Sequence, residues 1–194
     1  MSIPRLVLCV LVCTGLAACV TAPPPAAPAR GGREALYLCR SGVSNAPAIE
    51  RSGRIAGFTP YADVRGVALS RAPVSGCLSS GYGPRVRGGV GKFHDGVDLF
   101  TREPVPIAAA ADGTVEEATQ RNGYGNTILI RHKNGVATRY AHLSAFAPDI
   151  SRGARVRQGQ ILGTTGQTGN ATAVHLHYEV LVDGRAVNPL TVGR

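Results

Sequence analysis

The sequence predicts an all-β-dominated fold, a compact domain of antiparallel sheet, on three observations. From residue 72 onward, short apolar runs are separated by glycine-rich turns about every eight to twelve residues, a spacing typical of all-β domains. The chain contains 25 glycines, and few of its stretches repeat apolar residues with a helical period. Two dipeptides that favour tight hairpins, Asn134-Gly135 and Asp183-Gly184, close apolar runs. We therefore expect a sheet core and not a helical one.

The apolar runs predict the strands of this domain in order. The run 107–111 ends at the turn Asp112-Gly113, and the strand pattern resumes at 114–115. The runs 126–132 and 136–142 flank Asn134-Gly135 and predict a hairpin. Two further strands are expected over 159–163 and 176–181. The sequence shows no internal repeat, so one domain is expected.

The first 18 residues have the pattern of an export signal. Arg5 is followed by the apolar stretch 6–16, which is too short to remain as a membrane span. Leu16-Ala17-Ala18-Cys19 resembles the lipobox of bacterial lipoproteins, which implies a lipid on Cys19 that anchors the chain to a membrane. Val20, rather than aspartate, after this cysteine favours the outer membrane, facing the periplasm. The alternative is an ordinary secretory signal with an incidental cysteine.

Two segments separate the anchor from the β domain. Residues 19–33 contain a proline/alanine tract, which is typical of an extended spacer. Residues 34–71 form a lead-in whose first part, 34–39, is compatible with a short helix or a strand, and whose second part reads as irregular or strand-like. The predicted organisation is therefore a signal (1–18), an anchor and linker (19–33), a lead-in (34–71) and a β domain (72–194).

Two cysteines remain for the body of the protein. Cys9 and Cys13 leave with the signal and Cys19 is used by the lipid, so Cys39 and Cys77 are left in an oxidising compartment. We expect a Cys39–Cys77 disulfide that clamps the lead-in to the domain. A zinc site at these two cysteines is not favoured, because neither stands in a C-x-x-C pair.

The formal charge of +9, carried almost entirely by arginine, indicates an anionic partner. Phospholipid headgroups, anionic wall polymers and nucleic acid all have suitable charge. Exported lipoproteins rarely meet nucleic acid, and no basic motif interleaved with aromatic residues is present. We therefore read the charge as affinity for the cell envelope, and expect no nucleic-acid partner.

Five polar side chains form the chemical pattern of the chain. In a strand, His175 and His177 leave the same face, where two buried imidazoles need partners for their nitrogens. A catalytic zinc ion usually has three His, Asp or Glu ligands, and His94, Asp98 and His177 can supply them. His142 and His175 then remain beside the metal. With no H-E-x-x-H glutamate in the chain, these two histidines are the candidates for moving the proton of an attacking water.

The order of these motifs resembles that of the lysostaphin/LytM-type zinc endopeptidases, which cut peptide bonds in bacterial peptidoglycan. The resemblance runs from about residue 72 to 189, and its landmarks are Ser79-Ser80-Gly81-Tyr82-Gly83-Pro84-Arg85, Phe93-His94-Asp95-Gly96-Val97-Asp98, Tyr140-Ala141-His142-Leu143 and His175-Leu176-His177-Tyr178-Glu179. It implies a compact β-sheet domain with a zinc groove. His94, Asp98 and His177 would then be the zinc ligands, and His142 and His175 would orient the water and stabilise the tetrahedral intermediate.

The predicted function is zinc-dependent hydrolysis of peptide cross-links in the peptide stems of peptidoglycan. The alternative is a non-catalytic regulator that binds the wall and activates other hydrolases through a protein partner. A third hypothesis is an enzyme kept latent because residues 34–70 or a partner cover the groove. Of the other polar residues, we expect His132 to be structural, Glu179 to be either a support for the ligand strand or an outward charge, and Tyr82, Arg85, Arg87 and Lys92 to be at most substrate contacts.

Overall fold

The computed structural model describes residues 34–40, 42–87 and 90–194, and all regular secondary structure in these ranges is β-sheet. Within them, no helix is long and apolar enough to cross a membrane. The predicted signal, the lipid attachment at Cys19 and the proline-rich linker lie outside the described residues.

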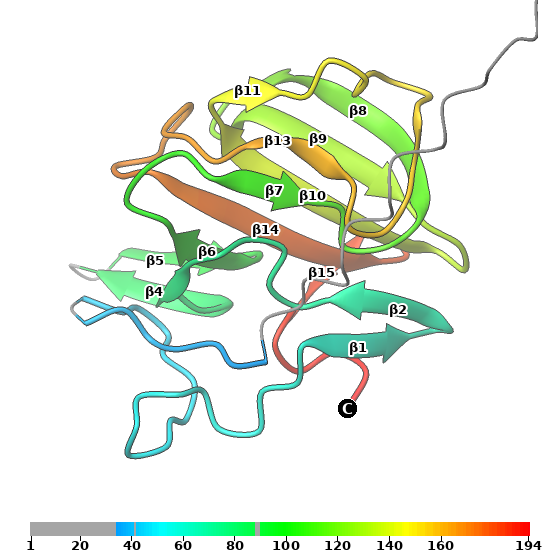
Figure 1. The fold of residues 1–194 in the computed structure, drawn as a ribbon. Coiled ribbons are helices and arrows are strands. Elements are labelled where there is room, and N and C mark those ends of the chain that lie inside the picture. The colour runs from blue at the N-terminus through cyan, green and yellow to red at the C-terminus, as the bar shows by residue number, and fades with distance from the viewer. Residues whose placement is uncertain (1–33, 41, 88–89) are drawn as a thin grey trace, which may run out of the picture.

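The described strands are short except for four that form the centre of the molecule (Figure 1). In chain order they are β1 (Tyr61–Val64), β2 (Val67–Ser70), β3 (Cys77–Ser80), β4 (Gly83–Arg87), β5 (Val90–His94), β6 (Val97–Phe100), β7 (Pro106–Ala108), β8 (Gly113–Arg121), β9 (Gly125–Arg131), β10 (Val136–Leu143), β11 (Ala145–Phe146), β12 (Arg155–Val156), β13 (Ile161–Thr164), β14 (His175–Val182) and β15 (Arg185–Val187).

One large antiparallel sheet organises the fold. Its strand order is β12-β8-β9-β10-β14-β6-β3, and β15 also pairs with β14. A three-stranded sheet, β11-β13-β7, lies over one face of β9 and β10, and the hairpins β1-β2 and β4-β5 lie beside β14 and β6 (Figure 1). The predicted antiparallel all-β fold is therefore confirmed.

The hairpin predicted at Asn134-Gly135 forms between β9 and β10, and Asp183-Gly184 joins β14 to β15 in the same way. Asn134 and Gly135 have φ of 57° and 72°, and Asp183 and Gly184 have φ of 50° and 75°. Two successive positive φ values give the turn twist that matches two antiparallel strands, which explains why Asn-Gly and Asp-Gly stand there. The strand predicted at 114–115 is longer, because β8 continues to residue 121 along β9. Its later residues are polar and exposed at the sheet edge, so they lack the apolar signal that reveals a buried strand.

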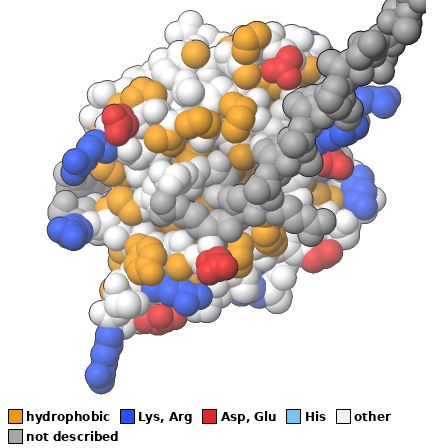
Figure 2. Space-filling model, in the orientation of Figure 1, with side chains coloured by type: hydrophobic (Ala, Val, Ile, Leu, Met, Phe, Trp, Pro, Cys, Tyr) orange, Lys and Arg blue, Asp and Glu red, His pale blue; other side chains and the backbone are white. Residues whose placement is uncertain are grey.

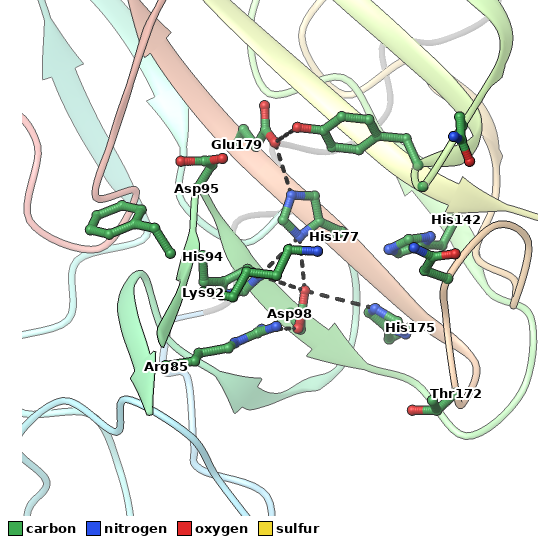
Figure 3. Close-up of a pocket in the computed structure, with 15 residues that line it drawn as sticks. Arg85, Lys92, His94, Asp95, Asp98, His142, Thr172, His175, His177 and Glu179 are labelled. Atoms are coloured by element: carbon green, nitrogen blue, oxygen red, sulfur yellow. Dashed lines mark hydrogen bonds and ion pairs between the residues drawn. The ribbon is translucent and has the colours of Figure 1, made fainter. Parts of the chain in front are cut away.

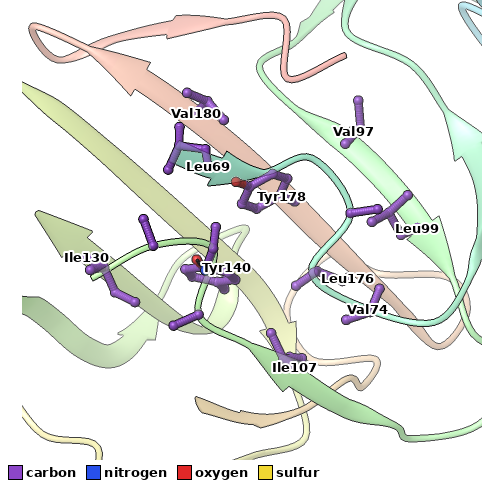
Figure 4. Close-up of a cluster of buried hydrophobic side chains, with 14 of the residues drawn as sticks. Leu69, Val74, Val97, Leu99, Ile107, Ile130, Tyr140, Leu176, Tyr178 and Val180 are labelled. Atoms are coloured by element: carbon purple, nitrogen blue, oxygen red, sulfur yellow. Dashed lines mark hydrogen bonds between the residues drawn. The ribbon is translucent and has the colours of Figure 1, made fainter. Parts of the chain in front are cut away.

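The core lies under the central strands β10 and β14 (Figure 4). Along β14, Leu176, Tyr178 and Val180 alternate with polar residues and are fully buried. Tyr178 stands opposite Tyr140 of β10, with ring centroids 5.5 Å apart. Burial of each such side chain stabilises the fold by about 1.5–3 kcal/mol. One face of β14 is thus given to the core, which leaves the other face for chemistry.

The lead-in packs as part of the same core. Leu36, Ile55 and Phe58 are buried within the cluster that includes the central sheet. Cys39 and Cys77 form the expected disulfide, with Sγ atoms 1.99 Å apart and Cα atoms 5.1 Å apart. Leu38 and Ser44 form bridges to Leu78 and Ser80, so this part of the lead-in lies along β3 at the edge of the large sheet.

Candidate metal centre

The large sheet brings three residues from distant parts of the chain to one point. The register of β6 against β14 sets Asp98 directly opposite His177. His94 ends β5, and the turn through Asp95 and Gly96 brings it back over β6. A Cβ atom on Gly96 would lie 2.4 Å from the carbonyl oxygen of Tyr178, so only glycine allows this turn to cross β14.

The three side chains meet within hydrogen-bonding distance (Figure 3). The Oδ1 atom of Asp98 lies 2.9 Å from His177 Nδ1 and 3.1 Å from His94 Nε2. The two ring nitrogens are 3.0 Å apart. Both histidines are buried, at 6% and 7% exposed. Among the described residues, these three form a group whose ligand atoms lie close enough together to hold a metal ion.

The hydrogen bonds on the far side of each ring decide what the near side offers. His94 Nδ1 donates to the carbonyl oxygen of Gly81 at 2.7 Å, and His177 Nε2 donates to Glu179 at 3.0 Å. Because a carbonyl or carboxylate only accepts, these two nitrogens hold the ring protons in the neutral forms. His94 Nε2 and His177 Nδ1 therefore present lone pairs to each other and to a carboxylate oxygen.

Three converging lone pairs fit a divalent cation. Zinc bonds of about 2.0–2.1 Å in tetrahedral geometry put ligand atoms about 3.3 Å apart, which is within a few tenths of an ångström of the separations found here. Two imidazole nitrogens and one carboxylate oxygen are also a donor set that zinc and related transition metals accept. The donor set and its spacing thus agree with the metal site expected from the sequence.

Electrostatics of the cluster favour positive charge at this point. Burial alone would lower the pKa of His177, but hydrogen bonds to Asp98 and Glu179 raise it to about 9. Burial alone would raise the pKa of Asp98, but its hydrogen bonds with His177 and His94 hold it well below its usual range. Without a metal, the carboxylate is therefore ionised and His177 is protonated at neutral pH, so a divalent cation would bind here by displacing that proton.

Arg85 holds the carboxylate oxygen of Asp98 that points away from the two imidazoles. Arg85 Nη2 lies 2.6 Å from Asp98 Oδ2 and also donates to Ser80. This arginine orients the carboxylate so that Oδ1 faces the two imidazoles. The sequence predicted Arg85 as at most a substrate contact, and its contacts assign it a positioning role instead.

Glu179 supports the ligand strand from the same face as His177. It is 2% exposed and accepts a hydrogen bond from the hydroxyl of Tyr124 at 2.7 Å, while Arg139 Nε lies 3.1 Å from its second oxygen. Carboxylates that bind the outer nitrogen of a metal-ligating histidine fix its ring orientation and tautomer. Of the two roles considered for Glu179, support of the ligand strand is therefore the one that forms.

His142 and His175 face the same cavity, with ring centroids 4.8 Å apart and ring planes tilted at 50° to each other. His142 Nδ1 donates to the carbonyl oxygen of Thr168, and His175 Nδ1 donates to that of Ala173, each at 2.8 Å. By the same reasoning, each Nε2 is unprotonated in the neutral form. Burial and the nearby His175 lower the pKa of His142 to about 4, so this ring is a neutral base at pH 7.

A bulge in β10 aims His142 at the cavity. The pairing of β10 with β9 shifts register between Tyr140 and Leu143, and His142 has a φ of 65°. A left-handed conformation is uncommon for a residue with a side chain, and such residues gather at functional sites. Here the backbone N–H of His142 donates to Tyr124 at 2.9 Å, which holds the bulge in place.

The site opens into a cavity of about 470 Å³. Arg85, Lys92 and the half-exposed Phe93 form one wall, and Asn122, Asn170 and Thr172 form the other. None of the described residues in the lead-in lines this cavity. The described part of 34–70 therefore does not cover the groove, which removes one of the two ways in which a latent enzyme was considered from the sequence.

The scan against protein families matches "Peptidase family M23" over residues 92–189, which is half of the chain and includes all five predicted site residues. The chain belongs to peptidase family M23.

Individual M23 relatives agree with the fold and the site. The peptidoglycan DD-endopeptidase ShyC of Vibrio cholerae is 41% identical over 141 residues, covering 68% of this chain and 32% of that protein. A zinc-containing peptidase from Vibrio cholerae has a TM-score of 0.59 and 32% identity, over 63% of this chain and 39% of that one. The catalytic domain of lysostaphin from Staphylococcus simulans has a TM-score of 0.53 and 34% identity, over 59% and 89%.

The chain spans about a third or less of the length of the curated relatives it matches. The resemblance to the lysostaphin/LytM type stated from the sequence is thus confirmed for the family and the fold. The ligand and base roles of the five residues stay predictions that their geometry supports.

Two predicted residues lie away from the chemistry. His132 is buried outside this cavity, with Nδ1 donating to the carbonyl oxygen of Asp112 at 2.7 Å and Nε2 2.8 Å from the hydroxyl oxygen of Thr138. Both ring nitrogens of His132 thus have partners within the fold, as expected for a structural histidine. Tyr82 donates its hydroxyl to Ala186 and does not line the cavity.

The sequence alone did not reveal Tyr124, Arg139 or the cavity wall that Asn122, Asn170 and Thr172 form. Tyr124 stands between two glycines, and no local pattern marks its side chain as part of a site. Nothing local marks Asn122, Asn170 or Thr172, because two separate loops bring them together. The loops touch where Gly125 and Gly169 pack so closely that a Cβ on either would overlap the backbone of the other loop.

Proposed function

We propose that the chain is a zinc-dependent endopeptidase that hydrolyses peptide cross-links of peptidoglycan. The observation that carries the proposal is the convergence of three ligand atoms, from His94, Asp98 and His177, in a cavity that the imidazoles of His142 and His175 also face. Membership of family M23 and relatives named as peptidoglycan endopeptidases support the substrate class.

In this proposal His94 Nε2, His177 Nδ1 and Asp98 Oδ1 hold the ion. The chemistry supplied by a bound zinc ion is polarisation of the scissile carbonyl and a lower pKa for water, which makes a nucleophile available near neutral pH. Arg85 and Glu179 keep the ligand atoms turned toward one another. This preorganisation spares the site a rearrangement during the reaction.

His142 and His175 move the protons. Each ring is fixed by a backbone carbonyl at Nδ1, so its Nε2 accepts a proton from the attacking water and returns it to the amine that leaves. When protonated, the same rings carry positive charge next to the oxyanion of the tetrahedral intermediate. His175 Nε2 lies 3.7 Å from Asp98 Oδ1, so it is close to the reacting centre.

The walls of the cavity suit a branched peptide. Asn122, Asn170 and Thr172 offer hydrogen bonds to peptide groups on one side. On the other side, the ammonium of Lys92 is exposed and offers a charge to a substrate carboxylate. Phe93 adds an apolar surface at the rim, packed edge-on against Tyr82 with centroids 5.1 Å apart.

We further propose that a lipid on Cys19 holds the enzyme at the outer membrane, facing the periplasm, with residues 19–33 as the spacer. The lipobox-like Leu16-Ala17-Ala18-Cys19 supports this location. The presence of a disulfide between Cys39 and Cys77 agrees with an oxidising compartment.

Digestion of purified sacculi tests the activity. The full chain is compared with added zinc, with a chelator, and as His177→Ala, and the released fragments are identified by mass. Cross-linked fragments should disappear only with the zinc-loaded native protein, and the new termini identify the bond. His132→Asn is the matched control, because it alters a buried histidine outside the cavity and should leave cleavage in place.

The alternative function has a different outcome. A chain that binds zinc and sacculi but leaves every cross-link intact would be a wall-binding regulator, and the endopeptidase proposal would be wrong. Stimulation of a separate wall hydrolase by that inactive chain would then identify its partner.

A further inference from the structure

A second concave surface lies apart from the metal cavity and shares none of its lining residues. It has a volume of about 1730 Å³ and is bordered by the β1–β2 turn, the β7–β8 turn, the end of β9, and β12 with the turn that follows it. We call it the basic groove and define it by the charged residues that line it, which are Arg131, Lys133, Arg155, Arg157, Asp112 and Asp149.

The cations of the groove are exposed and have no strong partner within the described part of the chain. Among the described residues, no ion pair involves Lys133, Arg155 or Arg157. Arg131 lies 3.9 Å from Glu116, with side chains 68% and 48% exposed, a geometry in which an ion pair contributes little. All four positive charges are therefore available to a ligand.

The two carboxylates of the groove are already engaged. Asp112 accepts the backbone N–H of Gln158 at 2.7 Å, and Asp149 accepts the side-chain amide of Gln160 at 2.8 Å. They hold the turn that follows β12 and leave the cations in excess. Hydrogen bonds from neutral amides leave both carboxylates charged, so four cations against two carboxylates give the lining a net charge of +2, and the groove attracts anions.

Contacts between hairpins fix one border of the groove. Arg65 of the β1–β2 turn donates to Asp183 at 2.7 and 2.9 Å, and Asn134 of the β9–β10 turn donates to the carbonyl oxygen of Arg65 at 2.8 Å. These contacts fix the β1–β2 turn next to the end of β9 and β10, at the right of Figure 1. The β4–β5 hairpin, which carries the first metal ligand, lies at the left of the same view.

The face drawn in Figure 2 carries its Lys and Arg side chains in scattered groups. These groups stand near the rim, with hydrophobic side chains between them singly or in small groups. A flat anionic membrane would make contact with such a rim at scattered points. A groove with cations along its walls instead fits an extended chain that enters it.

We propose that the basic groove binds a second strand of the wall polymer through the carboxylates of its peptide stems. The inference rests on the proposed function, because a cross-link joins two strands and an enzyme bound at one always has another within reach. Each peptide end that is not cross-linked carries a free carboxylate, which supplies the anionic groups. The groove would thus hold the enzyme on the polymer while the metal cavity takes the bond to be cut.

The test separates binding from cleavage. Arg155→Gln/Arg157→Gln is compared with the native chain and with Arg40→Gln/Arg51→Gln, which removes the same charge from exposed residues of the lead-in that line neither cavity. Sedimentation with purified sacculi in the presence of chelator measures binding alone. Two exposed charge contacts correspond to an affinity loss of about five- to tenfold.

Cleavage of a soluble, purified cross-linked muropeptide dimer provides the second readout. The groove variant should cleave this small substrate within twofold of the native rate, while its digestion of whole sacculi slows in parallel with its binding. The lead-in variant should change neither. Added salt should weaken native binding more than binding of the groove variant.

Three results would overturn the inference. The first is equal binding to sacculi by the groove variant and the lead-in variant. The second is a groove variant that loses binding to phosphatidylglycerol vesicles while keeping that to sacculi, which would make the occupant an anionic lipid. The third is a loss of dimer cleavage, which would make the groove part of the active site. A native chain that cleaves neither substrate would refute the proposed function, and the binding comparison would still decide on the groove.

Discussion

Two kinds of buried histidine occur on the same large sheet, and they differ in what their second ring nitrogen contacts. His132 has both nitrogens engaged, by a backbone carbonyl and a hydroxyl. His142 and His175 have one nitrogen held by a carbonyl, while the ring faces the cavity. His132 and His142 are buried to a similar degree, with exposed fractions of 7% and 9%.

The difference shows that burial does not distinguish a structural histidine from a chemical one. A histidine whose donor and acceptor are both satisfied has no capacity left for a proton or a metal ion. A histidine anchored at one nitrogen is oriented for use at the other. The proposed metal ligands follow the same rule, because Gly81 and Glu179 anchor the far nitrogens of His94 and His177.

The largest effect is expected from His142→Ala. Removing a proton-transfer group typically lowers the rate by about 10²- to 10⁴-fold, while the three metal ligands remain. The rate of cleavage of a soluble cross-linked dimer and the zinc content of the protein, measured on the same sample, check this. His132→Asn is the control that removes a histidine of the other kind. An unchanged rate in His142→Ala would contradict the distinction drawn between His132 and His142.

A smaller effect is expected from Glu179→Gln. An amide in place of the carboxylate weakens the hydrogen bond that orients His177, and such changes around a metal typically cost about 10- to 100-fold in metal affinity. Competition with a chromogenic chelator measures the affinity without any substrate. Glu116→Gln, at an exposed position of β8, is the matched control. Equal affinities in the two variants would mean that Glu179 does not position the ligand.

The smallest effect concerns the pH dependence of stability at His132. Burial lowers the pKa of His132 in the folded state, against smaller opposing effects of Asp112. The unfolded chain therefore binds a proton first as pH falls below about 6.5, and folding loses stability there by up to about 1.4 kcal/mol per pH unit. Above that pH both states are neutral and the contribution vanishes.

Urea unfolding of the native chain and of His132→Asn at pH 7.5 and pH 5.5 isolates this contribution as a difference of differences. The native chain should lose more stability on acidification than the variant. Chelator in both samples keeps the metal site in the same state. A steeper loss in the variant would show that His132 is not the buried neutral histidine described above.

Local sequence patterns predicted more of the fold than of the residues that orient the proposed metal ligands. Alternation along β14 placed His175 and His177 on one face, and the hairpin dipeptides located two turns, because both depend on residues adjacent in sequence. The pairing of Asp98 with His177 depends on the register of β6 against β14, which no local pattern encodes. It was inferred from the residue types that a metal needs.

The residues that orient the ligands could not be read in the same way. Glu179 shares the face of His177, two positions along β14, so its direction was predictable and its partner Tyr124 was not. Arg85 reaches Asp98 from a different hairpin. The bulge that turns His142 into the cavity arises from a register shift between β9 and β10, and it leaves no mark in the sequence.

Titration of metal-free protein with zinc, with cleavage of the soluble cross-linked dimer recorded at each addition, tests the central claim most directly. The account predicts no cleavage without metal, a linear rise to one equivalent, and no further rise beyond it, with no response at all from His177→Ala. Cleavage without metal, or an equal response from His177→Ala, would contradict a catalytic ion held by His94, Asp98 and His177.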